Sequence, residues 1–181
     1  MKDIRILYET FGAEEYYRTS GENYENPHEL QVKNLIIRNL HRWDCSGGVL
    51  DFCAGGGEVT RALQQSGIEN ISGCDPFTHA LYEKQTGLPC ARFSFEDIIK
   101  GADIGQYSLI ICSFALHLCP AKDLFPLTWA LLSAAPTLVL ITPHKRPELE
   151  LLPSFSLQYE DFELTEREKK VRLKEYILNV V

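Results

Sequence analysis

The sequence has 181 residues, a length that suits one domain of ordinary size. Hydrophobic residues make up 45% of it and charged residues 24%, which excludes a disordered, collagen-like or coiled-coil chain. The formal charge of −7 argues against nucleic acid as a partner, because phosphate backbones bind basic surfaces. The composition therefore predicts a soluble single domain over residues 1–181.

The cysteines and the N-terminus indicate a compartment. No CxxC pair or zinc-binding spacing occurs among Cys45, Cys53, Cys74, Cys90, Cys112 and Cys119. The N-terminus has no apolar stretch of signal-peptide length, and no apolar run reaches the roughly 20 residues that a membrane span needs. We expect a reduced, cytoplasmic protein with no metal site and no membrane segment.

An arm over residues 1–26 and a leading helix over residues 27–46 are expected at the start of the chain. Asn26 can cap this helix, Pro27 suits its first position, and Glu29 completes a capping box. Strands and helices then alternate through residues 48–142. The expected strands are 48–53, 68–74, 89–93, 107–113 and 137–142, and the expected helices are 58–65, 75–83, 95–100 and 123–133.

Strands that are apolar throughout, separated by helices, indicate a parallel sheet covered on both faces. The region 154–181 differs, because half-exposed strands at 162–165 and 172–177 flank a charged turn. This pattern predicts an antiparallel hairpin added to the edge of the sheet. The sequence therefore predicts a doubly wound, mostly parallel α/β fold with an N-terminal helical extension.

A glycine-rich turn over residues 54–57 comes directly after the first strand. At the carboxyl end of a parallel strand, such a turn lets a ligand approach the backbone and opens onto a helix N-terminus. A dinucleotide-binding turn needs the pattern G-x-G-x-x-G, but Thr60 stands where the third glycine should be. The turn therefore predicts a ligand other than a dinucleotide.

Two acids flank this turn. Asp51, inside the first strand, would repel a pyrophosphate but would suit an ammonium or sulfonium group. Asp75, at the end of the second strand, can accept hydrogen bonds from both ribose hydroxyls. The pair predicts a nucleoside with a cationic tail and no phosphates, a description that S-adenosylmethionine fits. Each acid also has a structural alternative: Asp51 could cap the turn backbone, and Asp75 could cap the helix that begins at Pro76.

These segments, together with residues 94–97 and 112–117, resemble the ordered motifs of class I S-adenosylmethionine-dependent methyltransferases. The resemblance covers roughly residues 26–181 and implies a seven-stranded sheet whose last hairpin contributes an antiparallel strand. It also implies S-adenosylmethionine as the cofactor of a core over residues 48–142. Two departures stand out: Cys53 replaces the usual glycine, and Ser108 replaces an acid that often opens the fourth strand.

The resemblance also implies roles for individual residues. Asp51 would lie near the methionine moiety and Asp75 would hold the ribose. Phe95 and Glu96 would lie beside the adenine, unless Phe95 only packs in the core. The full implied cofactor site is Asp51, Cys53, Ala54, Gly55, Gly57, Asp75, Pro76, Phe95, Glu96, Ser113 and Phe114.

Candidate acceptor-site residues come from two histidines and an aromatic arm. His117 could serve as a general base if the acceptor must lose a proton, or it could satisfy a loop backbone. His144, just beyond the fifth strand, has the same alternatives. Tyr16, Tyr17 and Tyr24 could form a lid over the substrate or pack on the sheet.

The residues just after the fourth strand constrain the acceptor. Nucleic-acid amino methyltransferases commonly carry Asp or Asn followed by Pro-Pro and an aromatic there, whereas this chain has residues 112–115, Cys-Ser-Phe-Ala. The connection from the fifth strand to the hairpin, about residues 143–160, is too short for a cap domain. We therefore expect a methyltransferase acting on a small molecule; the alternatives are a protein methyltransferase and a non-catalytic partner subunit. The sequence favours no oligomeric state.

Overall fold

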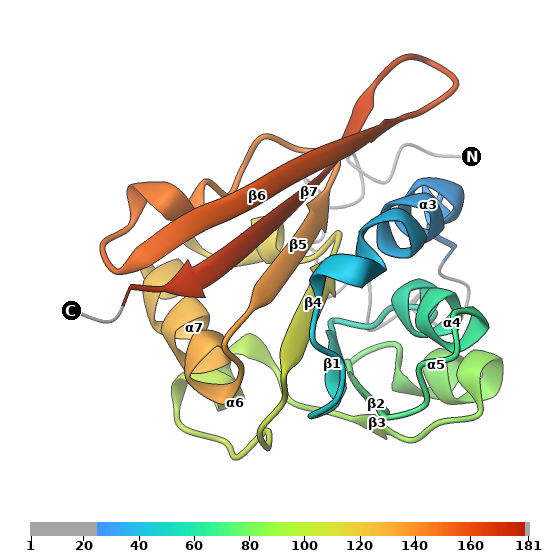
Figure 1. Ribbon diagram of the computed structural model, residues 1–181. Helices are drawn as coiled ribbons and strands as arrows, with labels where there is room; N and C mark the ends of the chain where they lie inside the picture. The colour runs from blue at the N-terminus through green and yellow to red at the C-terminus, as the bar shows by residue number, and fades with distance from the viewer. Residues whose placement is uncertain (1–24, 180–181) are drawn as a thin grey trace, which may run out of the picture.

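The computed structural model describes residues 25–179, which form a seven-stranded sheet with helices on both faces (Figure 1). The strands are β1 (Val49–Phe52), β2 (Ile71–Cys74), β3 (Cys90–Ala91), β4 (Leu109–Ser113), β5 (Leu138–Thr142), β6 (Phe155–Leu164) and β7 (Lys170–Leu178). The α-helices are α3 (Glu29–Asn39), α4 (Glu58–Gln65), α5 (His79–Thr86), α6 (Phe95–Ile99) and α7 (Ala121–Ala134). Short 3-10 turns are η2 (Leu40–Arg42), η3 (Leu116–Leu118) and η4 (Leu149–Leu151).

The strand order is β3-β2-β1-β4-β5-β7-β6. β1 runs parallel to β2 on one side and to β4 on the other, so the strand order reverses between β1 and β4. Open α/β sheets bind their ligands at such a reversal, beyond the carboxyl ends of the strands. β7 pairs antiparallel with both β5 and β6. The predicted doubly wound sheet with an antiparallel C-terminal hairpin is confirmed.

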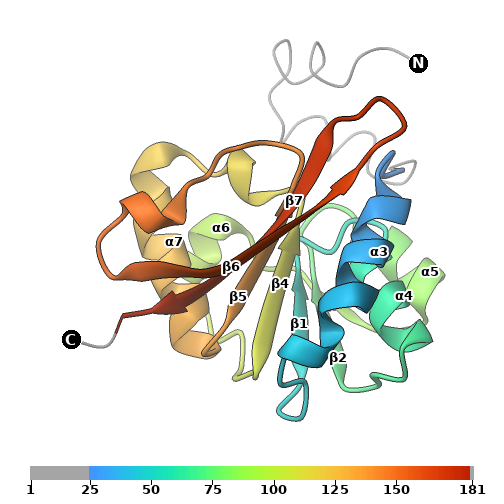
Figure 2. The same cartoon turned by 45° about the horizontal axis from the view of Figure 1, so that its top comes forward.

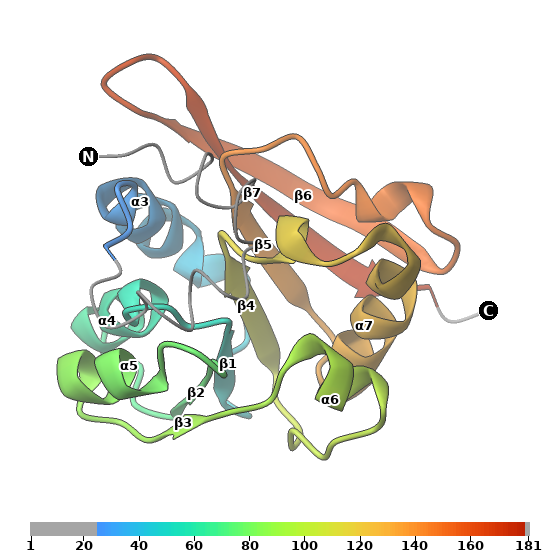
Figure 3. The same ribbon diagram turned by 180° about the vertical axis from the view of Figure 1, so that it is seen from behind.

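Helices cover both faces of the sheet (Figures 2 and 3). Along β4, Leu109 and Ile111 pack in the same core as α3 and α4, while Ile110 and Cys112 pack in the core beneath α6 and α7. All five β4 residues are buried. This two-sided burial explains why the strand is apolar from Leu109 to Cys112 instead of alternating with polar residues.

The hairpin is longer than the sequence predicted. β6 begins at Phe155 rather than at residue 162, and its exposed residues alternate with half-buried ones. An edge strand can carry charges such as Glu160 and Asp161 because one of its faces is solvated. These polar residues concealed the first half of the strand, and the connection from β5 shortens to residues 143–154.

Several other predicted boundaries are wrong by a few residues. β2 begins at Ile71 rather than at residue 68, β3 contains two residues, and α7 begins at Ala121 rather than at residue 123. The leading helix ends as an α-helix at Asn39 and continues only as the turn η2.

The predicted cap at the start of the leading helix is also wrong. α3 begins at Glu29 with His28 as its N-cap residue and no side-chain cap. Asn26 instead accepts a hydrogen bond from the backbone N–H of His28 at 2.9 Å. The side chain of Asn26 therefore stabilises the turn before the helix.

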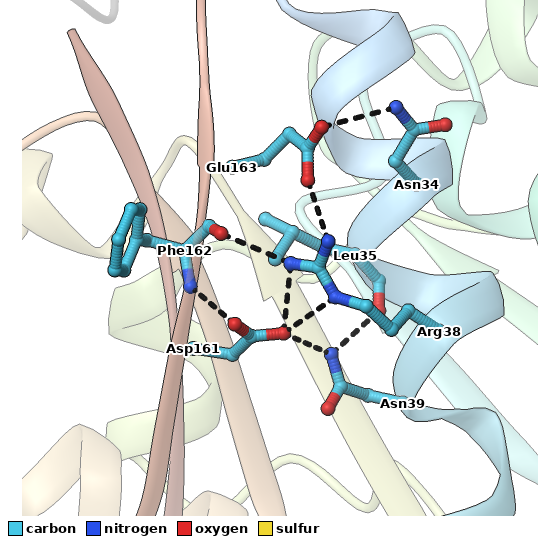
Figure 4. A network of polar contacts seen from close by, with 7 residues as sticks. All are labelled: Asn34, Leu35, Arg38, Asn39, Asp161, Phe162 and Glu163. Atoms are coloured by element: carbon cyan, nitrogen blue, oxygen red, sulfur yellow. Dashed lines mark hydrogen bonds and ion pairs between the residues drawn. The ribbon is translucent and has the colours of Figure 1, made fainter.

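Polar contacts hold α3 against the hairpin (Figure 4). Arg38 forms ion pairs with Asp161 at 2.8 Å and with Glu163 at 2.7 Å. Asn39, which is buried, donates to the backbone carbonyl of Leu35 at 2.9 Å and to Asp161 at 2.8 Å. Two segments about 120 residues apart in sequence are thereby joined.

Membrane-spanning helices and metal-binding clusters are both absent from residues 25–179. No helix in this range has the length and apolar character to cross a bilayer. The same residues contain no group of three or more His, Cys, Asp and Glu side chains able to hold a metal ion.

Candidate functional site

A pocket of about 750 Å³ lies where the carboxyl ends of the parallel strands meet. Its lining includes most of the predicted cofactor residues: Cys53, Gly55, Asp75, Pro76, Phe95, Glu96, Ser113 and Phe114. The lining formed by the described residues leaves out Asp51, Ala54 and Gly57. The fold therefore brings four separate chain segments to one cavity of the size that small-molecule sites have.

Asp75 joins two turns at the floor of this pocket. One carboxylate oxygen accepts the backbone N–H of Gly55 at 3.1 Å, and the other accepts those of Phe77 at 2.9 Å and Thr78 at 2.8 Å. Helix α5 takes Thr78 as its N-cap residue, so the alternative in which Asp75 caps a helix starting at Pro76 is wrong. A carboxylate offers about four acceptor positions, so Asp75 can still receive a ligand hydroxyl.

Asp51 is fully buried behind the glycine turn. Its Oδ2 accepts the backbone N–H of Thr60 at 3.1 Å and the Thr60 hydroxyl at 2.7 Å. Its Oδ1 is buried and has no hydrogen-bond partner among the described residues. Burial raises the pKa of Asp51 to about 8, and the nearby carboxylates of Glu58 and Asp75 act in the same direction. A ligand group that donates a hydrogen bond, such as an ammonium group, would give this oxygen the partner that the described residues do not supply.

The glycine turn has the backbone that glycine favours. Gly55 and Gly57 have φ values of +55° and +83°. A Cβ at Gly57 would lie 2.4 Å from a side-chain carbon of Thr86, so this glycine lets α4 approach α5 closely. Gly57 therefore shapes the turn without lining the pocket.

Two larger residues share this left-handed conformation. Cys53, just after β1, and Phe114, just after β4, both have φ of +57°. The glycine that the family usually carries at the position of Cys53 has its explanation in this backbone angle, which costs other residues about 1–2 kcal/mol. Strain of this kind gathers at ligand sites, where the surrounding fold over-determines the backbone.

The thiols of Cys53, which lines the pocket, and of Cys74, at the end of β2, are both neutral. A hydrogen bond with Cys112 and burial raise the pKa of Cys53 well above its ordinary value. Burial likewise raises the pKa of Cys74 to about 12. Neutral thiols are poor nucleophiles, so these side chains pack as small apolar groups.

The adenine candidates begin helix α6. Ser94 and Asp97 form a capping box that fixes the start of this helix. Phe95 is half-buried, lines the pocket, and lies 5.9 Å from the Phe52 ring, so it packs against the core as well. Glu96 is exposed and forms an ion pair with Lys100 at 2.6 Å.

The two histidine candidates form a pair. The ring centroids of His117, in η3, and His144, after β5, lie 4.6 Å apart. Neither belongs to the pocket lining as the described residues form it, although the neighbours Ala115 and Leu118 do. Burial lowers the pKa of His117 to about 4, with His144 acting in the same direction. Its Nδ1 is buried without a hydrogen-bond partner in residues 25–179, so this nitrogen does not bind the loop backbone.

One contact at the pocket escaped the sequence reasoning. His28, just before α3, stacks on Phe114 with ring centroids 5.3 Å apart. Nothing in the sequence relates these two positions, and only the packing of α3 beside the strand ends brings them together. The predicted lid residues Tyr16, Tyr17 and Tyr24 lie outside the described residues.

Comparisons with known proteins extend this picture. No family model matches the sequence. An uncharacterized protein of Schizosaccharomyces pombe is 32% identical over 184 residues, covering 77% of this chain and 74% of that protein. An uncharacterized methyltransferase of Synechocystis is 34% identical over 102 residues, covering 54% of this chain and 44% of that protein. The second match thus spans less than half of the cyanobacterial protein.

Solved structures share the fold at low sequence identity. A magnesium protoporphyrin IX methyltransferase from Synechocystis, with bound S-adenosylmethionine, has a TM-score of 0.65 at 18% identity, covering 99% of this chain and 98% of that one. The N-methyltransferase NodS from Bradyrhizobium japonicum, in complex with S-adenosylhomocysteine, has a TM-score of 0.65 at 12% identity, covering 91% of this chain and 99% of that one. The fold of this chain is therefore the one that these two methyltransferases share.

Proposed function

We propose that this chain, a member of the class I methyltransferase family, transfers a methyl group from S-adenosylmethionine to a small-molecule acceptor. The observation that carries the proposal is the pair of acids at the strand-order reversal. Asp75 lines the pocket with acceptor capacity to spare, and Asp51 keeps a buried oxygen that lacks a partner among residues 25–179.

The residues present fit this cofactor. Asp75 would hold the ribose hydroxyls, Asp51 would meet the ammonium group, and Phe95 would lie along the adenine. The cofactor supplies an electrophilic methyl group on a positively charged sulfur. The chain's residues supply positioning and exclusion of water, which account for much of the acceleration of an in-line displacement.

His117 is the candidate for handling an acceptor proton. A pKa lowered to about 4 leaves its imidazole neutral at physiological pH, so a ring nitrogen can accept a proton. An acceptor that loses a proton on methylation, such as a hydroxyl, would need such a group. His144 lies against His117 and would orient its ring.

Two features favour a small acceptor. The acidic chain is poorly suited to hold a nucleic acid. The connection between β5 and β6 has only residues 143–154, and the described chain adds no cap domain there. Recognition then falls to short loops around the pocket, which suit a small molecule better than a folded partner.

Calorimetric titration with S-adenosylmethionine and S-adenosylhomocysteine tests cofactor binding. We expect binding in the micromolar range, and Asp75→Ala should weaken it at least tenfold because the ribose loses its acceptor. Asp103→Ala is the matched control, since Asp103 also accepts a backbone N–H but lies outside the pocket lining. Absence of binding by the wild type would overturn the enzyme and favour the partner subunit.

Transfer of a radiolabelled methyl group then tests the acceptor class. Metabolite pools and protein extract are offered separately, and we expect label in the acid-soluble metabolite fraction. His117→Gln should slow transfer without weakening cofactor binding. Label that precipitates with protein would contradict the small-molecule acceptor and favour a protein methyltransferase.

A further inference from the structure

We infer that Tyr82 is a positioning residue for the cofactor: through Thr60, its hydroxyl holds the Asp51 carboxylate so that Oδ1 accepts no hydrogen bond from residues 25–179 and can accept one from the ammonium group. The inference rests on the proposed function. Tyr82 lies in helix α5, outside every motif that the sequence showed.

Three hydroxyl and carboxylate groups form a chain in the core. The Tyr82 hydroxyl lies 2.9 Å from Thr60 Oγ1, which lies 2.7 Å from Asp51 Oδ2. All three side chains are fully buried. They come from α5, α4 and β1, so this series of hydrogen bonds joins two helices to the strand that leads into the glycine turn.

A glycine makes room for the tyrosine. Gly73 pairs directly with Asp51 across β1 and β2. A Cβ on Gly73 would lie 2.3 Å from the Tyr82 ring and 2.7 Å from its hydroxyl oxygen. The ring therefore fills the space that Gly73 leaves, and this packing fixes where the hydroxyl lies.

The direction of the hydrogen bonds follows from counting protons. Thr60 has one hydroxyl proton, which it donates to Asp51. Tyr82 must then donate its own proton to Thr60. The backbone N–H of Thr60 donates to the same Asp51 oxygen, so Oδ2 accepts two hydrogen bonds while Oδ1 accepts none from the described residues. The chain thus saturates one oxygen and leaves the other as an acceptor for a ligand.

The groups around Asp51 oppose its negative charge, so the ionised carboxylate depends on the hydrogen bonds that it accepts. The groups that act electrostatically on Asp51 are the carboxylates of Glu58 and Asp75, and the buried thiols Cys74 and Cys90 interact with it too. Burial raises the pKa of Tyr82, so its phenol keeps its proton. Among the strongest influences of residues 25–179 on the pKa of Asp51 there is no basic side chain. Donated hydrogen bonds are therefore what stabilises the ionised carboxylate that a cation needs.

The test compares two ligands and two tyrosines by calorimetry at pH 6.5 and pH 8.5. S-adenosylhomocysteine carries the ammonium group, whereas 5′-methylthioadenosine lacks the whole amino-acid portion. Tyr82→Phe should weaken S-adenosylhomocysteine about three- to tenfold at pH 6.5, the loss expected for one hydrogen bond near a charge. The loss should shrink at pH 8.5, where a larger share of Asp51 is already ionised before the ligand binds. Binding of 5′-methylthioadenosine should be unchanged at both pH values.

Tyr176→Phe is the matched control. Tyr176 is equally buried, and its hydroxyl donates to Glu150 at 2.6 Å, away from the glycine turn. This variant should lose stability without losing affinity for either ligand. Thr60→Val removes the hydroxyl between Tyr82 and Asp51 and should weaken S-adenosylhomocysteine as Tyr82→Phe does. Thr60→Ser keeps that hydroxyl and should bind S-adenosylhomocysteine as the wild type does. This second pair of variants tests the same hydrogen bonds if Tyr82→Phe folds poorly.

The outcomes separate the two proposals. A wild-type protein that binds neither ligand overturns the proposed function. A wild type that binds both, with Tyr82→Phe equal to it for S-adenosylhomocysteine at pH 6.5, overturns the role of Tyr82 alone. Equal weakening of both ligands would also overturn it, because that result indicates a general distortion of the pocket.

Discussion

Asp51 is a carboxylate whose environment opposes its charge in the free protein. In the folded state its pKa is raised from 3.8 to about 8, so between these values the folded protein holds a proton that the unfolded chain has lost. Stability from this group is therefore present in acid and decreases as pH rises towards 8. His117 acts in the opposite sense, because its pKa falls from 6.5 to about 4 and stability rises across that lower range.

Asp51→Asn tests this linkage at the residue scale. We expect the free wild-type protein to lose at most about 1.4 kcal/mol of unfolding free energy per pH unit between pH 6.5 and 8 through this group. The Asp51→Asn variant cannot titrate at this position, so its stability should vary less with pH. Urea unfolding at three pH values measures the slopes, with Asp103→Asn as an exposed control. Parallel slopes for the wild type and the variant would show that Asp51 is already ionised near neutrality.

At the scale of elements, α3 connects the hairpin to the pocket. Its last residues contact β6 through Arg38 and Asn39 (Figure 4). The residue before its first turn, His28, stacks on Phe114 in the pocket wall. The two polar side chains contribute differently to the stability of the fold. The Arg38 side chain is 47% exposed, so its ion pairs are weakened by water and salt, whereas Asn39 is buried.

Alanine substitutions separate these contributions. Asn39→Ala should lower the unfolding free energy by about 1–3 kcal/mol, because it removes the two hydrogen bonds that the buried Asn39 amide donates to the Leu35 carbonyl and to Asp161. Arg38→Ala should cost less than about 1 kcal/mol, and high salt should remove most of that cost. Urea unfolding at low and high salt measures both. A larger loss from Arg38→Ala than from Asn39→Ala would reverse this ranking of buried and exposed contacts.

At the scale of the whole molecule, the pocket is lined by chain segments that come together only when the sheet is folded. A ligand that binds there binds the folded state and not the unfolded chain, so it must raise the melting temperature. Residues after β1, β2 and β4 contribute to one pocket, and loss of the sheet separates them.

S-adenosylhomocysteine at about 100 times its dissociation constant should stabilise the protein by about 2.7 kcal/mol. For a chain of this length the melting temperature should rise by roughly 5–10 °C. ATP is the control, because the turn lacks the dinucleotide fingerprint and Asp51 would repel phosphates, so it should give no shift. A shift with ATP equal to that with S-adenosylhomocysteine would contradict the proposed cofactor class. Differential scanning fluorimetry is sufficient for both ligands.

The local order of elements and the main site acids were predictable from the sequence. Strands such as β4 were predictable because burial on both faces makes most of their residues apolar. Glycines and acids near the carboxyl ends of such strands indicate a ligand site. The start of β6 was not predictable, because an edge strand carries charges that resemble those of a loop. The start of α5 was missed because residues 76–78 form a turn, which Asp75 holds by accepting the N–H groups of Phe77 and Thr78, before the helix begins at His79.

By itself, the sequence determined the fold class, the glycine turn and the two acids, since these depend on short-range patterns of burial and backbone geometry. Only the tertiary structure decided which atoms of those acids remain available. It placed Tyr82 over Gly73 and brought His28 onto Phe114. It also gave Asp51 one oxygen that accepts two hydrogen bonds and one buried oxygen without a partner among the described residues. Such pairings join residues from different elements, and their geometry follows from how helices pack on the sheet, which no local pattern of residues specifies.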